Sequence, residues 1–231
     1  MTALDSAHVL VVGATGGLGS AISRHLAGRG ARLTLSSRSP DRLDALAADL
    51  GDAVLGTHPA DITFPTAPAE VVRAAVERGP LDGVIYAAGV VAFGPVAELD
   101  DDVLDALLLV NLVAPLRLAR AAVPVLTAGG FLANLSAVVA ERPTAGMAAY
   151  SAVKAGLTAF DTALAHELRR QKVRVLDVRP PHTETGLAMR PLDGRAPALG
   201  AGLAPEAVAE RIVRAIEQDE RDLPASAFTS S

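Results

Sequence analysis

The chain has 231 residues, a length that suits one large α/β domain or two small ones. Half of the residues are apolar and only 3% are aromatic, so alanine, valine and leucine must build most of the core. The formal net charge is −5 and no stretch is strongly basic, which argues against a nucleic-acid partner. Cysteine is absent and the five histidines lack the spacing of metal ligands, so disulfides, thiolate chemistry and a metal site are not expected.

The most apolar segments do not indicate a membrane protein. The longest one, residues 103–126, contains Asp105, Asn111, Arg117 and Arg120, so a buried helix explains it better than a membrane span. The N-terminus has no basic residues before its short apolar run and therefore differs from a signal peptide. We expect a cytoplasmic protein without a membrane partner.

In chain order, short apolar or β-branched runs alternate with segments of helical period. Strands are predicted at 8–12, 31–36, 53–57, 82–87, 130–136 and 173–178, with a final edge strand at 223–228. Helices are predicted at 17–28, 40–50, 66–78, 101–127, 147–171 and 205–218. This alternation predicts an α/β fold: a single domain over residues 1–231, with a doubly wound parallel sheet of about seven strands and helices on both faces. The long irregular stretch 180–204 is rich in proline and glycine, and we predict that it serves the substrate site.

The segment "VVGATGGLGSAISRHL" follows the first predicted strand and opens a helix. Gly13, Gly17 and Gly19 give the pattern G-x-x-x-G-x-G. Glycine lets the backbone turn sharply and approach a pyrophosphate closely, while the start of the helix supplies N–H groups. Between a strand and a helix, this pattern predicts a dinucleotide site.

The second strand ends in "LTLSSRSP", at a point where an acidic residue often binds the ribose hydroxyls of NAD. This chain has Ser37 and Arg38 there. A carboxylate would repel a 2′-phosphate, whereas a guanidinium beside a hydroxyl binds one through charge-assisted hydrogen bonds. We therefore predict NADP(H) rather than NAD(H) as the cofactor; the alternative is that Arg38 is an ordinary solvated arginine.

The segment "AAYSAVKAG" holds one of the two tyrosines and one of the two lysines of the chain. Tyr150 and Lys154 are four residues apart and so share one face of a helix. A free tyrosine has a pKa of about 10, and a nearby cation lowers that pKa. A compact ammonium can also hold sugar hydroxyls, for which a flat guanidinium is less suited. We predict that Tyr150 is an acid–base group and Lys154 its partner; the alternative is an ordinary exposed helix pair.

With its glycine loop and its Tyr150-x-x-x-Lys154 pair in one domain of this length, the chain resembles the short-chain dehydrogenase/reductase family over essentially its whole length. The resemblance implies a Rossmann-like fold and an oxidoreductase that interconverts a carbonyl and a secondary alcohol with NADP(H) and without a metal. It also implies further cofactor contacts, at Thr15, Leu18, Asp61, Ala88, Gly89, Pro180 and Thr185. The matched positions are flanked by apolar residues, which predict a small, largely apolar substrate: Val90, Val91, Phe93, Val138, Val139 and Met147.

The resemblance places a third catalytic residue at Asn111, where the family has an asparagine that supports a proton-relay water leading to the lysine. Pro115, four residues further on, has no N–H, so the Asn111 carbonyl loses its helical donor and is free to hold a water. The alternative is a kinked core helix with one buried and satisfied asparagine.

The substrate-orienting serine of the family aligns with Ala137, one residue after Ser136. Successive strand residues point to opposite faces, so Ser136 can replace the family serine only if the strand end is distorted. We include Ser136 among the catalytic residues on that hypothesis; otherwise Tyr150 alone holds the substrate oxygen.

Several other departures from the family pattern leave alternatives open. "YAAG" at 86–89 lacks the two usual asparagines, and Pro181 replaces a usual glycine. His182 and Glu184 would overlook the substrate, and His182 is either an extra acid–base group or a surface residue. These departures permit a second hypothesis, a regulator or scaffold that binds NADP(H) without turnover. The helices at 101–127 and 147–171 resemble the family's dimer-forming pair, so a homodimer or homotetramer is expected unless the low aromatic content alone explains their composition.

Overall fold

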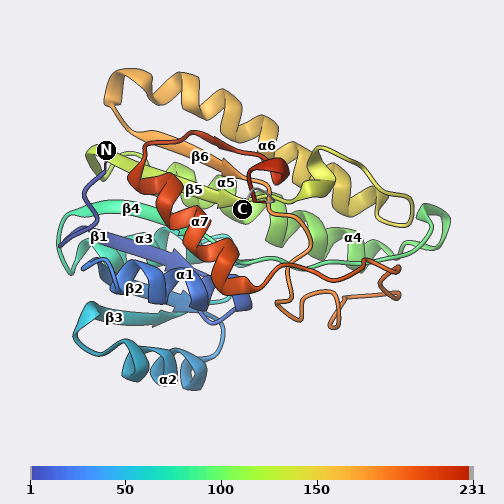
Figure 1. Cartoon of the computed structure of the whole chain (residues 1–231), viewed down its shortest axis with the longest axis horizontal. Coiled ribbons are helices and arrows are strands. Elements are labelled where there is room, and N and C mark those ends of the chain that lie inside the picture. The colour runs from blue at the N-terminus through green and yellow to red at the C-terminus, as the bar shows by residue number, and fades with distance from the viewer. Residues whose placement is uncertain (1, 229–231) are drawn as a thin grey trace.

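The computed structural model describes residues 2–228. Seven strands form one parallel sheet in the order β3-β2-β1-β4-β5-β6-β7 (Figure 1). The strands are β1 (His8–Val12), β2 (Arg32–Ser37), β3 (Val54–Pro59), β4 (Leu81–Tyr86), β5 (Leu126–Leu135), β6 (Arg174–Val178) and β7 (Asp222–Leu223). The helices are α1 (Gly17–Ala27), α2 (Pro40–Leu50), α3 (Ala67–Val76), α4 (Asp101–Leu108), α5 (Ala114–Ala122), α6 (Ala148–Glu167) and α7 (Pro205–Glu217). The predicted Rossmann-like architecture is confirmed.

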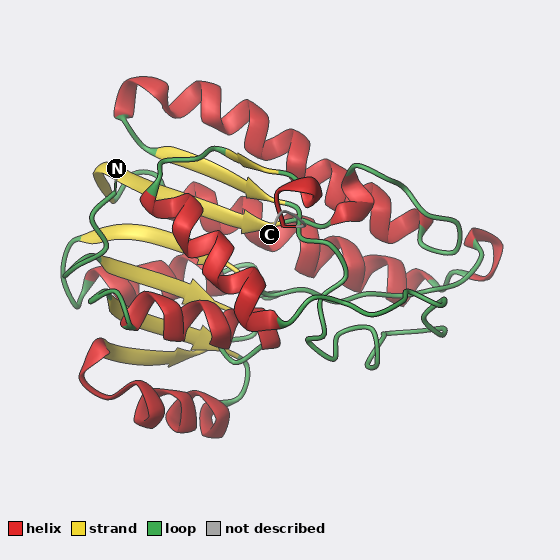
Figure 2. Ribbon diagram, viewed as in Figure 1, coloured by secondary structure: helices red, strands yellow, loops and turns green. Residues whose placement is uncertain are grey.

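Helices cover both faces of the sheet (Figure 2). On β1, Val9 and Val11 belong to the core under α1, α2 and α7, whereas Leu10 and Val12 belong to the core under α3 and α5. Alternate strand residues point to opposite faces, so a strand buried on both sides must be apolar throughout. That requirement explains the uninterrupted apolar run of β1. None of the helices in the described chain combines the length and apolarity needed to cross a bilayer.

Two predicted elements differ from the structure. The single helix expected over 101–127 is divided into α4 and α5 by a π-helical turn at Leu109–Val113, and β5 already begins at Leu126. Within this turn the N–H of Ala114 donates to the carbonyl of Leu109, five residues back, and the next residue, Pro115, has no N–H to donate.

The predicted extent of the edge strand, 223–228, was also wrong. β7 has only two residues, and a short 3₁₀ helix follows at Ala225–Phe228. Pro224 lies between them and has no N–H for the sheet ladder, so pairing ends there.

The loop 180–204 is closed at its neck by backbone hydrogen bonds. Leu203 N donates to the carbonyl of His182 at 2.9 Å, and Glu184 N donates to the carbonyl of Leu203 at 3.0 Å. Glu184 Oε1 accepts from Gly202 N at 2.7 Å and lies 3.5 Å from His182 Nε2. In this structure, therefore, His182 and Glu184 hold the two ends of the loop together.

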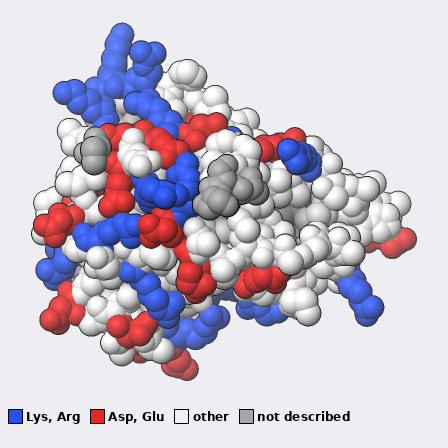
Figure 3. All heavy atoms as spheres, viewed as in Figure 1, with Lys and Arg blue, Asp and Glu red and all other residues white. Residues whose placement is uncertain are grey.

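All seven strands are parallel, so their carboxyl ends meet at one edge of the sheet, on the right in Figure 1. The direction in which successive strands are added reverses between β1 and β4, and crevices for ligands form at such reversals. The basic side chains are not concentrated at this edge. They gather near the carboxyl end of α6, where Arg169, Arg170 and Lys172 are exposed (Figure 3). That end is where cations complement the helix dipole.

Candidate active site

The glycine loop connects β1 to α1 and packs closely against two other loops. Gly13 has φ +82°, and a Cβ atom there would lie 2.5 Å from the backbone nitrogen of Ala88. A Cβ atom on Gly17 would lie 2.6 Å from Cβ of Thr185, and one on Gly19 would overlap the carbonyl oxygen of Gly13. Only glycine fits at these positions. The half-buried start of α1 thus offers backbone N–H groups to an anion, as a pyrophosphate requires.

Two hydroxyls and one arginine, Arg42, meet at the end of β2. Thr15 Oγ1 donates to Ser37 Oγ at 2.9 Å, and the guanidinium of Arg42 donates to the carbonyl oxygen of Thr15. Arg38 is exposed, and within residues 2–228 it makes no hydrogen bond or ion pair. Arg42 was not among the residues expected at this site. Its position in the first turn of α2 is the signal, because helical side chains lean toward the N-terminus and therefore back over the end of β2.

The remaining residues expected at the cofactor lie along the same edge. Asp61 follows β3 and its Oδ1 accepts from both N and Oγ1 of Thr63, at 3.0 and 2.8 Å. Pro180 follows β6, and its carbonyl oxygen accepts from Val138 N at 3.0 Å. Leu18 is half-buried and packs on the core under α1. The fold thus places these residues along one edge of the sheet. Among the described residues, no group of three acidic or histidine side chains could hold a metal ion.

Tyr150 and Lys154 both lie on α6 and both are buried. Lys154 Nζ is 5.8 Å from the centroid of the Tyr150 ring and donates to the carbonyl oxygen of Leu135 at 2.8 Å. Burial raises the pKa of the Tyr150 hydroxyl above its ordinary value, and this effect opposes the lowering expected from a neighbouring ammonium. Burial also lowers the pKa of Lys154 to about 8, while Asp177 and Asp161 act in the opposite direction.

A cavity of about 230 Å³ adjoins Tyr150. Apolar and polar surface contribute about equally to its wall, and the tip of the loop 180–204 closes one side of it, since Phe93 N donates to the carbonyl of Asp193 at 3.0 Å. The lining includes Ala92, Phe93, Pro95, Val96, Leu99, Leu107 and Met147, with Glu98, Asp193 and Arg195 as its charged members. A small apolar group would fit this space beside the phenol.

Asn111 lies in the π-helical turn and is fully buried. Its Nδ2 donates to the carbonyls of Val90 and Leu107, each at 3.0 Å, and its Oδ1 accepts from Val90 N at 3.3 Å. A Cβ atom on Gly89 would lie 3.3 Å from Asn111 Oδ1 and 3.9 Å from Lys154 Nζ. The asparagine therefore fixes the chain after β4 directly beside the lysine.

Ser136 continues β5, and its hydroxyl is directed toward α6. Ser136 N donates to the carbonyl of Val178 at 2.7 Å, so the ladder with β6 extends to this residue without a shift in register. Ser136 Oγ donates to the carbonyl of Lys154 at 2.9 Å and accepts from Thr158 Oγ1 at 3.1 Å. The hydroxyl thus supports the backbone at the lysine, and Ala137 is the next residue in extended conformation.

Replacing Ser136 by alanine is expected to lower the free energy of unfolding by about 1–2 kcal/mol, because two buried hydrogen bonds are lost. Turnover should fall far less than when the Tyr150 hydroxyl is removed. Urea unfolding and initial rates on the same preparation measure both effects. Ser151→Ala is the matched control, since its buried hydroxyl has no partner within the described chain. A loss of turnover of about 10²-fold or more in Ser136→Ala would instead place this hydroxyl on the substrate.

Three polar residues near the site were not singled out from the sequence. Tyr86, at the position of a missing asparagine, donates its hydroxyl to the carbonyl of Val110 in the π-helical turn at 2.6 Å. Asp161 on α6 and Asp177 on β6 are buried between the helix and the sheet, at 2% and 4% exposure. Asp161 lies seven residues after Lys154, which is two helical turns, and this spacing is the signal that could have revealed it.

A family model described as short chain dehydrogenase matches residues 7–195. An uncharacterised oxidoreductase of Staphylococcus aureus (strain MRSA252) is 29% identical over 223 residues, which cover 94% of each chain. A short chain dehydrogenase of Burkholderia cenocepacia J2315, solved with NADP, is 28% identical with a TM-score of 0.86 and covers 98% of this chain and 99% of its own. A dehydrogenase/reductase of Burkholderia phymatum, solved with NAD, is 20% identical with a TM-score of 0.88, covers 97% and 90%, and shares the fold.

Proposed function

We propose a specific activity on the premise that this chain belongs to the short-chain dehydrogenase/reductase family, as the match over residues 7–195 shows. The proposed activity is NADPH-dependent reduction of a small, largely apolar ketone, or the reverse oxidation of a secondary alcohol. The observation that carries it is the buried Tyr150–Lys154 pair, whose tyrosine lines a cavity, on the same sheet edge as the glycine loop. The homodimer or homotetramer and the cytoplasmic location expected from the sequence stay predictions.

The glycine loop, the end of β2 and the loop after β6 would hold the dinucleotide. Backbone N–H groups at the start of α1 suit its pyrophosphate, and Thr185 lies against Gly17 where that pyrophosphate would be enclosed. Ser37, Arg38 and Arg42 suit a 2′-phosphate, since the Arg42 guanidinium reaches Thr15, Thr15 bonds to the Ser37 hydroxyl, and Arg38 follows Ser37 directly in the chain. When bound, the reduced nicotinamide supplies the hydride for the carbonyl carbon.

Tyr150 would donate its proton to the carbonyl oxygen of the substrate. Burial raises the pKa of its hydroxyl, so the group is protonated at neutral pH and available as an acid. The Lys154 ammonium would stabilise the phenolate left by that transfer and hold the ribose hydroxyls. Asn111 fixes the chain segment beside this ammonium, and we propose that its backbone carbonyl holds a water through which the proton is replaced.

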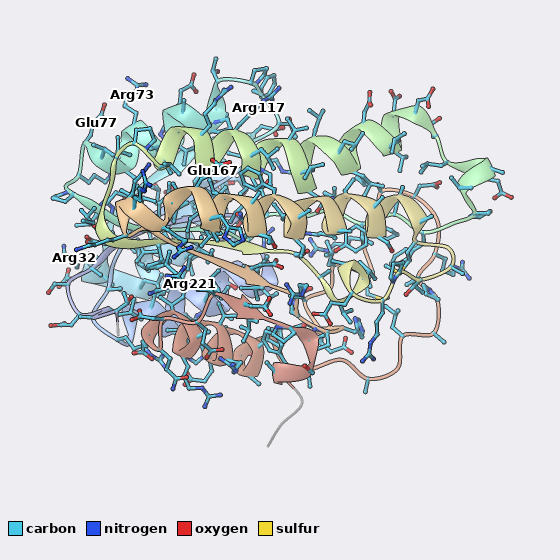
Figure 4. The ribbon with its side chains drawn as sticks, turned by 90° about the horizontal axis from the view of Figure 1, so that it is seen from above. Arg32, Arg73, Glu77, Arg117, Glu167 and Arg221 are labelled. Carbon is cyan, nitrogen blue, oxygen red and sulfur yellow. The ribbon has the colours of Figure 1, made fainter. Side chains whose placement is uncertain are left out.

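Replacing Arg38 by alanine is expected to raise the dissociation constant for NADPH by about 10-fold or more, because a charge-assisted contact to the 2′-phosphate is lost. Affinity for NADH should change little, since NADH lacks that phosphate. Fluorescence titration with both dinucleotides measures the two constants. Arg73→Ala is the matched control, because Arg73 is an exposed arginine on α3 and is not part of this site (Figure 4). Equal effects on NADPH and NADH would rule out the role of Arg38.

The second candidate is a regulator that binds NADP(H) and turns over nothing, and Ala137 together with Tyr86–Gly89 motivates it. A panel of ketones with NADPH, followed by loss of absorbance of the reduced cofactor, separates the two functions. Turnover of any ketone that depends on Tyr150 supports the reductase. Binding of NADPH without turnover across a broad panel supports the regulator.

A further inference from the structure

Helix α6 buries a polar stripe against the sheet. Ser151, Lys154, Thr158 and Asp161 follow one another at spacings of three, four and three residues, so they share one side of the helix. All are buried except Thr158, which is half-buried. A helix that packs on a sheet usually turns an apolar side toward it. The polar stripe therefore requires a reason beyond packing.

The sheet opposes this stripe with polar groups of its own. Asn134 Nδ2 donates to Asp161 Oδ1 at 2.6 Å. Asn134 and Asp177 are register partners on β5 and β6, so their side chains lie on the same face of the sheet. The Thr158 hydroxyl donates to Ser136 Oγ at 3.1 Å. The carboxyl groups of Asp161, on α6, and Asp177, on β6, thus lie between this helix and the sheet, on the same side of α6 as Lys154.

The charges beneath α6 differ in how they are compensated. Lys154 donates to one backbone carbonyl, and within residues 2–228 no carboxylate forms a direct ion pair with it. Asp177 has a direct ionic partner, because its Oδ2 accepts from Arg179, which also binds Glu141 and Asp222, although its Oδ1 is buried without a partner among the described residues. Asp161 has only the amide of Asn134, and its Oδ2 is buried without a partner in the described chain. A buried cation and a buried anion that lack partners are each costly.

No other charged side chain of the described residues competes for this position. β5 and the π-helical turn carry none, and Glu141, beyond the 3₁₀ turn at Val138–Ala140, binds Arg179. The three aspartates of α4 include Asp105 and are all exposed, as are Arg169 and Arg170 after α6. The groups that face Lys154 are therefore Tyr150 on its own helix, Asp161, and the Asp177–Arg179 pair.

We propose that Asp161 and Asp177 are positioning residues for Lys154: Asp177 carries the buried negative charge that maintains the ammonium, and Asp161 is a neutral carboxylic acid. Burial raises the pKa of Asp161 well above its ordinary value, and the charge of Asp177 acts in the same direction. Burial raises the pKa of Asp177 as well, but the Arg179 guanidinium opposes this directly. Of the two carboxyl groups, Asp161 therefore holds the proton.

The charge of Asp177 has a definite effect on the pKa of Lys154. The negative charge of Asp177 raises the pKa of Lys154 and so opposes the effect of burial. Removing that charge favours the neutral amine. Asparagine has nearly the shape of a protonated aspartate, so Asp161→Asn exchanges one neutral group for another. The two substitutions should therefore affect Lys154 very differently.

The test uses the fact that Lys154 and Lys172 are the only lysines of the chain. Full-length protein labelled with ¹³C at lysine Cε gives two signals, and Lys172 is the exposed one. We expect Asp177→Asn to lower the titration midpoint of Lys154 by about one pH unit or more. Asp161→Asn should leave it within a few tenths of a unit of the wild-type value, as should Glu167→Gln, an exposed carboxylate on the same helix (Figure 4). An unmoved midpoint in Asp177→Asn, or an equal shift in Asp161→Asn, would overturn the proposal.

A measurement on the wild-type protein covers the case in which Asp177→Asn does not fold. With ¹³C-labelled aspartate carboxyl groups, one buried carboxyl, assigned by its absence in Asp161→Asn, should stay protonated through neutral pH. Its titration near the ordinary aspartate value of about 3.9 would contradict the assignment.

The kinetic consequence rests on the proposed function. In kcat/KM for NADPH, the loss of rate at high pH should move to lower pH in Asp177→Asn and stay in place in Asp161→Asn. The lysine and carboxyl titrations need no turnover, so a protein without reductase activity would refute the proposed function and leave this inference to be decided by the titrations alone.

Discussion

Replacing Tyr150 by phenylalanine is expected to lower kcat for ketone reduction by about 10³-fold, within the range of 10²–10⁴ typical for loss of a general acid. The substitution removes only the hydroxyl of a residue that lines the cavity and leaves the ring that packs in the surrounding core. NADPH affinity should therefore stay within a few-fold of the wild-type value. Initial rates at saturating NADPH, with a fluorescence titration of the cofactor, measure both quantities.

The other tyrosine provides the control for this substitution. Tyr86→Phe removes a buried hydroxyl that bonds to the carbonyl of Val110, so it should lower the free energy of unfolding by about 1 kcal/mol and largely retain turnover. Undiminished turnover in Tyr150→Phe would remove the phenol from the reaction and favour the regulator. An equal loss in both variants would indicate a general effect on the fold.

Replacing Lys154 by methionine is expected to lower kcat by about 10²-fold or more, because the phenolate that Tyr150 leaves is then unsupported in a buried site. Methionine has a similar length and no charge, so it fills the space without an ammonium. Lys172→Met is the matched control, since it removes the only other lysine from an exposed position. A variant of Lys154 as active as that control would show that the ammonium has no part in the chemistry.

The pH dependence of the wild-type enzyme should agree with this role. Burial lowers the pKa of Lys154 to about 8, so the ammonium is present below that pH and is lost as pH rises through it. We therefore expect kcat/KM for NADPH, which reports groups of the free enzyme, to fall as pH rises through about 8. The same fall should be missing from the much lower activity of Lys154→Met.

The sequence contained most of the fold because each strand and helix has its own local pattern. The apolar run at residues 9–12 of β1 and the helical period of α2 were readable without tertiary information, and in the structure Ser39 caps α2 by accepting from Arg42 N. The division of the 101–127 segment was only half visible. Pro115 indicated that a helical hydrogen bond is lost. The π-helical turn that accommodates the proline, however, depends on how Asn111 and Tyr86 pack.

The candidate site was predictable where a motif fixes the backbone and less so where side chains meet across elements. The glycine loop follows from steric limits at Gly13 and Gly17 that hold in any sequence of this kind. The contact of Arg42 with Thr15 and the association of Asp161 with Asn134 join residues 27 positions apart in each case, and no local pattern encodes them. The orientation of Ser136 likewise depends on the position of α6, which periodicity alone cannot give.

The central claim is that Tyr150 exchanges a proton beside a dinucleotide held by the glycine loop. A crystal structure of the NADP complex tests this claim most directly. We expect the nicotinamide ring to lie beside the Tyr150 hydroxyl, with Lys154 bound to the adjoining ribose and Arg38 to the 2′-phosphate. A nicotinamide ring bound away from the cavity next to Tyr150, with Lys154 still directed only at Leu135, would contradict the account.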